Sequence, residues 1–68
     1  MARPNELDRY LIQFRQADKD YFITDCAYRD GQLEDAKRYV EMAVDTLEET
    51  VAGRIFDCDE DRVIEEYS

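Results

Sequence analysis

The first part of the chain carries apolar residues at alternating three- and four-residue steps, which is the spacing of an α-helix. In NELDRYLIQFRQADKDYFITDCAYRD this stripe consists of Leu7, Tyr10, Phe14, Ala17, Tyr21, Thr24 and Tyr28. Asn5 is a favourable N-cap, Pro4 precedes the helix, and Gly31 favours its end. The pattern therefore predicts a first helix over residues 6–29.

The same periodicity continues in GQLEDAKRYVEMAVDTLEETVAG, where one stripe holds Leu33, Ala36, Val40, Ala43, Val44, Leu47 and Val51. Gly53 favours the end of this segment, so we expect a second helix over residues 33–52. The turn near Gly31 is too short for anything but an antiparallel hairpin. The short run RIFDC could be extended, but a lone strand would have nothing to pair with.

The C-terminal segment FDCDEDRVIEEYS opens with aspartates at every second position. Asp57, Asp59 and Asp61 match the first three ligand positions of an EF-hand calcium loop. The sixth position, which needs glycine, is Arg62, and the twelfth is Ser68 instead of a bidentate glutamate. These departures disfavour a metal site.

A capped helix accounts for more residues of this segment. Asp57 at the N-cap and Glu60 three residues later resemble a capping box, and acids in a first turn suit the helix dipole. The apolar residues that would then share one face are Val63, Ile64 and Tyr67. We expect a third, short helix over residues 58–67.

Three helices in this order predict an all-α fold, an antiparallel helical hairpin plus a short C-terminal helix. A chain of 68 residues forms a single small domain, residues 1–68. Such a chain buries only ~60% of its unfolded surface. The first helix would also carry a second apolar patch, at Ile12, Ile23 and Cys26, which either the C-terminal helix or another chain could cover. With so thin a core, we expect a homodimer in which two hairpins pack as a helical bundle.

Residues 27–44, AYRDGQLEDAKRYVEMAV, combine small residues and a turn glycine in a recognisable order. Tyr28 comes late in the first expected helix, Gly31 lies at the turn, and Ala36 and Ala43 follow where close helix packing needs small residues. In these features the segment resembles the middle of a single tetratricopeptide repeat, a helical hairpin. The resemblance implies binding of a protein or peptide.

Charge is abundant and unevenly distributed. Eighteen acidic and nine basic residues give a net charge of −9. Residues 1–40 hold eight acids and seven bases, whereas residues 41–68 hold ten acids and two bases. This balance repels phosphate backbones and anionic lipid, so we expect neither direct nucleic-acid binding nor membrane binding. The abundance of Asp and Arg would also suit a salt-rich cytoplasm or a GC-rich genome.

Enzyme chemistry lacks its usual groups. The chain has no histidine, its only serine is Ser68, and no glycine-rich loop could hold phosphate, so we expect no enzyme and no cofactor. Cys26 and Cys58 are too few for a zinc site, and the expected hairpin separates them by ~30 Å, so both should be free thiols. The absence of an apolar N-terminal stretch favours a cytoplasmic location, that of the host cell if a phage encodes the chain.

The second half of the chain carries the candidate binding residues. On the second expected helix, like charges four residues apart cost ~0.2–0.5 kcal/mol per pair and gain nothing locally. A solvated helix face is the simpler explanation, and the tail adds further carboxylates that favour a selected surface. The predicted partner-binding residues are Glu41, Asp45, Glu48, Glu49, Asp57, Asp59, Glu60, Asp61, Glu65 and Glu66.

These features predict a small acidic regulator or inhibitor that binds a basic site on a protein partner. Its carboxylates could mimic nucleic acid and occlude a nucleic-acid-binding protein, as small phage and mobile-element proteins of similar size and charge do. The alternative is an adaptor or assembly module that binds through its apolar, tyrosine-rich helix face. RNA binding by a hairpin dimer is a third possibility, and the negative charge opposes it.

Overall fold

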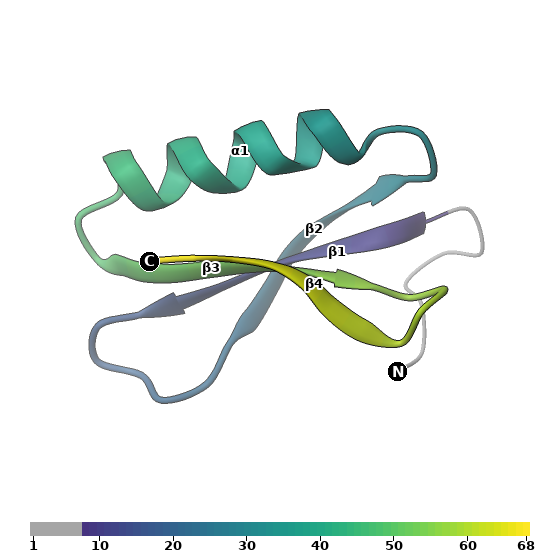
Figure 1. Ribbon diagram of the computed structural model, residues 1–68. Helices are drawn as coiled ribbons and strands as arrows, with labels where there is room; N and C mark the ends of the chain where they lie inside the picture. The colour runs from purple at the N-terminus through teal and green to yellow at the C-terminus, as the bar shows by residue number, and fades with distance from the viewer. Residues whose placement is uncertain (1–7) are drawn as a thin grey trace.

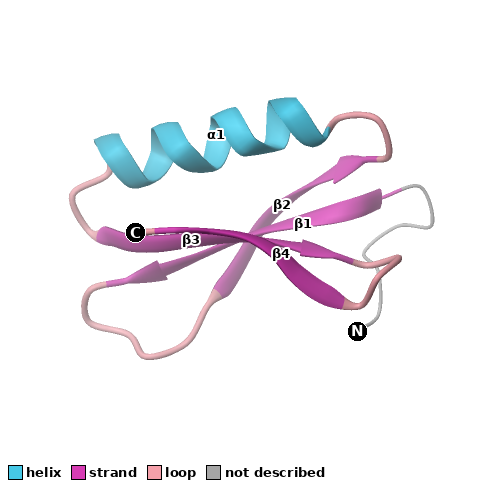
Figure 2. Ribbon diagram, in the orientation of Figure 1, coloured by secondary structure: helices cyan, strands magenta, loops and turns pink. Residues whose placement is uncertain are grey.

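The computed structural model describes residues 8–68. Its elements are β1 (Asp8–Gln16), β2 (Ile23–Arg29), α1 (Leu33–Thr46), β3 (Thr50–Asp57) and β4 (Arg62–Tyr67). The four strands form one antiparallel sheet in the order β2-β1-β3-β4, and α1 lies across one face of it (Figures 1 and 2). The helix joins two β-hairpins, whose inner strands β1 and β3 pair at the centre of the sheet.

The expected all-α fold is wrong. Of the first helix expected over 6–29, residues 8–29 form the β1–β2 hairpin, and residues 58–67 form a turn and β4. The helix expected over 33–52 exists but ends at Thr46. The antiparallel helical hairpin is therefore absent from residues 8–68, and the expected dimeric helical bundle has no hairpin to build on. Pro4, Asn5 and Leu7, on which the expected helix start depended, lie outside the described residues.

The sequence of β1 satisfies helix and strand spacing at once, because a four-residue step is also two strand repeats. Alternation places Tyr10, Ile12 and Phe14 on the face toward α1. Leu11 and Gln13 lie on the opposite face, hereafter the open face, yet they are only 2% and 4% exposed. Since both faces are buried, β1 lacks the alternation of apolar and polar residues that identifies a strand.

The core lies between the sheet and α1. Tyr10 and Ile12 of β1 and Ile55 of β3 pack against Ala36 and Val40 of α1. Further side chains of β1, of both edge strands and of α1 surround this cluster, namely Phe14, Cys26, Tyr28, Leu33, Tyr39, Val44, Ile64 and Tyr67. The run RIFDC, for which no pairing partner was expected, lies in the middle of the sheet because β1 and β4 flank it.

Gly53, expected as a helix stop, instead allows α1 to lie close to β3. A Cβ atom at this position would lie 2.7 Å from Cγ1 of Val40 and 3.0 Å from Cγ2 of Val44. Gly31 has a different role, since its φ of 89° is a left-handed conformation in the turn between β2 and α1. Packing thus requires glycine at position 53, and the backbone conformation favours glycine at position 31.

Candidate functional site

The ten predicted partner-binding carboxylates do not form one strip. They separate toward the two ends of β3, which runs from the C-terminal end of α1 to the β3–β4 turn (Figure 1). The group near the start of β3 consists of Glu41, Asp45, Glu48, Glu49 and Glu66. The group in and beside the β3–β4 turn consists of Asp57, Asp59, Glu60 and Asp61. Glu65 lies on β4 between these groups, 3.5 Å from Lys37 of α1.

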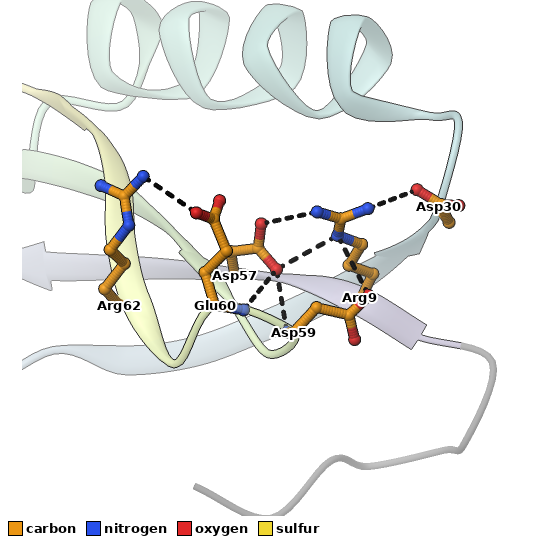
Figure 3. A network of polar contacts seen from close by, with 6 residues as sticks. All are labelled: Arg9, Asp30, Asp57, Asp59, Glu60 and Arg62. Carbon is orange, nitrogen blue, oxygen red and sulfur yellow. Dashed lines mark hydrogen bonds and ion pairs between the residues drawn. The ribbon is translucent and has the colours of Figure 1, made fainter.

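Asp57 is an internal residue and not part of a binding surface. Its side chain is 1% exposed and accepts two hydrogen bonds from Arg9, from Nε to Oδ1 and from Nη2 to Oδ2, each 3.1 Å long (Figure 3). Arg9 also donates to Asp30 over 2.7 Å. The backbone N–H groups of Asp59 and Glu60 donate to Asp57 Oδ1 over 2.9 and 3.3 Å. Asp57 therefore holds the β3–β4 turn and ties it to β1.

The protonation of Asp57 reflects two opposed effects. Burial alone would raise the pKa of this carboxyl group. The hydrogen bonds from Arg9 and from the backbone of Glu60 outweigh burial and hold the pKa below its ordinary value. Asp57 is consequently a carboxylate at neutral pH, and its charge is balanced within the protein.

The other acids of the β3–β4 turn also have local roles. Asp59 lies 3.4 Å from Nε of Arg9, and Glu60 pairs with Arg62 over 3.1 Å. Asp61 adopts a left-handed conformation with φ of 54°, which aspartate tolerates better than most residues. Over residues 8–68, no group of three or more His, Cys, Asp or Glu side chains is arranged to hold a metal ion. The alternating aspartates thus build a hairpin turn.

The carboxylates near the start of β3 border an open groove between α1 and the end of β4. The residues lining this acidic groove are Arg38, Glu41, Met42, Val44, Asp45, Thr50, Val51, Glu66, Tyr67 and Ser68. Glu41, Asp45 and Glu66 are exposed, and Met42 is 57% exposed. For these three carboxylates the described structure records no salt bridge. The groove can therefore accept ammonium or guanidinium groups beside an apolar wall.

Glu48 and Glu49 extend the acidic groove only loosely, because they lie in the turn that follows α1. Both side chains are exposed. The carbonyl oxygen of Glu49 accepts a hydrogen bond from the backbone N–H of Ala17 over 2.9 Å. This bond attaches the turn to the β1–β2 loop, so the backbone here is positioned although the carboxylates are solvated.

A polar row on the open face was missed from the sequence. Gln13 donates to Oγ1 of Thr24 over 3.2 Å and accepts from Nε of Arg54 over 2.7 Å, and the Arg54 guanidinium lies 3.9 Å from the Phe22 ring centroid. The available signal was a glutamine within the apolar run YLIQF, since a buried amide needs partners. These contacts satisfy one another and give this row a structural role.

The two cysteines are thiols and not a disulfide, as the sequence predicted. Cys26 lies in β2, where burial first and the neighbouring Asp25 second raise its pKa to about 11. A thiol whose pKa lies well above 8.5 contains little thiolate at pH 8 and reacts slowly.

We expect Cys26 to react with iodoacetamide at pH 8 on the order of 100-fold more slowly in the native protein than in denaturant. The measurement uses the Cys58→Ser variant, so that only one thiol contributes. Equal rates with and without denaturant would contradict the partly buried position of Cys26 in β2.

Residues 8–68 contain no helix with the length and apolar character required to cross a bilayer. Comparison with known proteins yields no matching protein-family model, no matching curated protein and no matching solved structure. The functional conclusion therefore depends on the geometry and charge of the acidic groove.

Proposed function

We propose that the protein is a non-enzymatic binding module, a small regulator or inhibitor, that presents the acidic groove to a basic site on a partner protein. The observation that carries this proposal is the pair of exposed carboxylates Glu41 and Asp45 on α1, next to the exposed side chain of Met42. Glu66 of β4 also lines the groove, and its strand position opposite Arg54 directs its side chain toward the open face. A partner with lysine or arginine beside an apolar residue would complement this combination.

Two of these carboxylates work against the helix that carries them. Glu41 and Asp45 are four residues apart, and such a like-charge pair costs ~0.2–0.5 kcal/mol. Asp45 also lies in the last turn of α1, which contains no basic residue. Negative charge at this end opposes the helix dipole, typically by ~0.3–1 kcal/mol at an exposed position. Asp45 thus lowers the stability of α1, and neither carboxylate forms a salt bridge within residues 8–68, which favours a role in binding.

The proposed contact surface is smaller than the sequence predicted. It retains the five carboxylates near the start of β3 and excludes Asp57, which is buried against Arg9. Adjacent carboxylates on one helix face are separated by about 5–6 Å, close to the spacing of phosphates along one nucleic-acid strand. A nucleic-acid-binding protein is therefore one class of target with a suitable basic site.

The helix face required by the alternative adaptor function is absent from residues 8–68. That function required an apolar, tyrosine-rich face on a helix over residues 6–29. Tyr10 and Tyr28 instead lie in strands, and both pack in the core. Tyr39 of α1 also packs there, with its ring 5.8 Å from that of Phe14. No tyrosine-rich helix face is present in the described part of the chain.

The test compares binding of a fluorescent deca-lysine peptide to two variants of equal net charge. The groove variant is Glu41→Gln/Asp45→Asn/Glu66→Gln, and the control is Glu34→Gln/Asp35→Asn/Asp61→Asn, whose sites lie outside the groove. We expect the groove variant to bind about tenfold more weakly by fluorescence anisotropy, and the control to change by less than about threefold. Equal weakening of both variants would show that only net charge attracts the peptide, and would defeat the proposal.

A further inference from the structure

The outer edge of β4 borders the acidic groove. β4 pairs with β3 on one side, and no segment within residues 8–68 pairs with its other side. An edge strand presents a row of backbone N–H and C=O groups that can pair with another strand. Glu66 and Tyr67 belong both to this strand and to the lining of the groove. Backbone hydrogen-bonding groups and a charged groove are thus adjacent.

We propose that an extended basic segment of the partner protein binds by adding a fifth strand to the sheet beside β4. The inference rests on the proposed function and specifies the form in which the partner binds. Strand addition obtains affinity from backbone hydrogen bonds and specificity from alternate side chains. The acidic groove supplies the specificity on one side of the added strand.

The opposite edge, β2, fits a basic segment less well. Over Ile23–Arg29 it carries one acid and one base, Asp25 and Arg29, so its own charge is balanced. The Asp25 carboxylate already accepts a hydrogen bond of 2.6 Å from the hydroxyl of Tyr39. By contrast, β4 itself carries two acids and one base, and the groove beside it adds Glu41 and Asp45 with one cation, Arg38. Charge therefore selects the β4 edge.

A second copy of the chain is a poorer occupant than a basic segment. Each copy carries a net charge of −9, and pairing two β4 edges would bring two acidic grooves together. Long-range repulsion of this kind opposes association at low and moderate salt. A basic segment is attracted by the same charges, so charge complementarity identifies the occupant.

The two faces of the sheet determine the sequence that the added strand should have. Glu65 of β4 faces α1, because it reaches Lys37, whereas Val63 lies opposite Phe56 on the open face. Successive side chains of an added strand alternate between these two faces. The matching segment carries lysine or arginine at positions facing the groove and apolar residues at positions next to Val63.

The test uses two heptapeptides of identical charge, both capped at their ends. The first is Lys-Val-Lys-Val-Lys-Val-Lys. The second has the same sequence with methyl groups on two consecutive central backbone nitrogens, so that whichever nitrogen faces β4 cannot donate. We expect the methylated peptide to bind at least about tenfold more weakly, because it loses backbone hydrogen bonds. Bound to the unmethylated peptide, the amides of Val63–Tyr67 should exchange hydrogen more slowly, whereas those of Ile23–Arg29 should not change.

The outcomes separate this inference from the proposed function. If both peptides bind equally and the groove variant weakens both, the groove attracts basic segments but strand addition is wrong. Slower exchange at β2 instead of β4 also overturns strand addition. If the groove variant binds both peptides as tightly as the unaltered protein, the proposed function fails and the inference fails with it. A dimer with protected β4 amides in the absence of peptide would show that a second copy occupies the edge.

Discussion

Replacing Gly53 with alanine is expected to destabilise the protein by about 3 kcal/mol, the upper end of the range for overpacked cores. The added methyl group would lie 2.7 Å from Cγ1 of Val40 and 3.2 Å from Cδ1 of Phe14. Val40 is fully buried and its side chain is β-branched, so it cannot rotate away without moving α1. Urea unfolding followed by circular dichroism measures the change.

A second substitution distinguishes a steric cause from a general loss of stability. Val40→Ala alone should cost about 2 kcal/mol through the cavity that it leaves. In the double variant Gly53→Ala/Val40→Ala, the methyl group added at position 53 takes the space vacated at position 40. The loss of unfolding free energy should therefore be smaller than the sum of the two single losses by at least about 1 kcal/mol. Gly31→Ala is the control, because no atom lies within 4 Å of its added methyl group. Val40→Ala should not compensate for it, and additivity at Gly53 would contradict the close approach of α1 to β3.

The helix α1 was predictable because its residues repeat with helical period over a polar opposite face. Ala36, Val40 and Ala43 are its buried residues, and all three belong to the predicted stripe. The β1–β2 hairpin was not predictable in the same way. Tyr10 and Phe14 are four residues apart, which fits both periods, and the buried Leu11 and Gln13 remove the alternation that would have favoured a strand.

One wrong assignment then determined the next. The run RIFDC fits an extended strand, but it has no pairing partner when its neighbour in the sheet, β1, is predicted as a helix. In the structure Ile55 pairs with Ile12 of β1 on one side and with Glu65 of β4 on the other. Strand pairing depends on residues far apart in the chain, so a local period cannot reveal it.

The candidate site was predictable in composition but not in arrangement. The sequence identifies the acidic half of the chain, and Glu41 and Asp45 share the helix on which they were placed. Asp57 was grouped with them because no local pattern reveals that Arg9, 48 residues earlier, is its partner. Glu66 joins the groove only because β4 returns alongside β3. Contacts between residues far apart in the chain therefore determine which carboxylates are exposed and which are paired with a cation.

Replacing Asp57 with asparagine is expected to cost about 2 kcal/mol at pH 7, less than the 3–5 kcal/mol of a fully buried pair because Arg9 is 25% exposed. Asparagine keeps an oxygen for the turn N–H groups but leaves the Arg9 guanidinium without its buried counter-charge. The melting temperature should fall by roughly 10 °C, since 1 kcal/mol corresponds to about 4–8 °C in a domain of this size. Asp30→Asn is the matched control, because it removes another carboxylate partner of Arg9 at a site that is 75% exposed. Its expected cost is below about 1 kcal/mol.

The stabilisation by Asp57 should also depend on pH in one direction. The pKa of Asp57 is lower in the folded protein than in the unfolded chain, where a carboxyl group of this kind has a pKa of about 3.9. The stabilisation is therefore complete above the unfolded pKa and is lost as the pH falls through the folded pKa. The difference in unfolding free energy between the unaltered protein and Asp57→Asn should therefore be constant from about pH 5 to 8 and shrink below about pH 4. Comparing two variants at each pH cancels the changing repulsion among the other carboxylates. A difference that persists undiminished in acid, or an equal loss from Asp30→Asn, would mean that the charge of Asp57 does not hold the β3–β4 turn to β1.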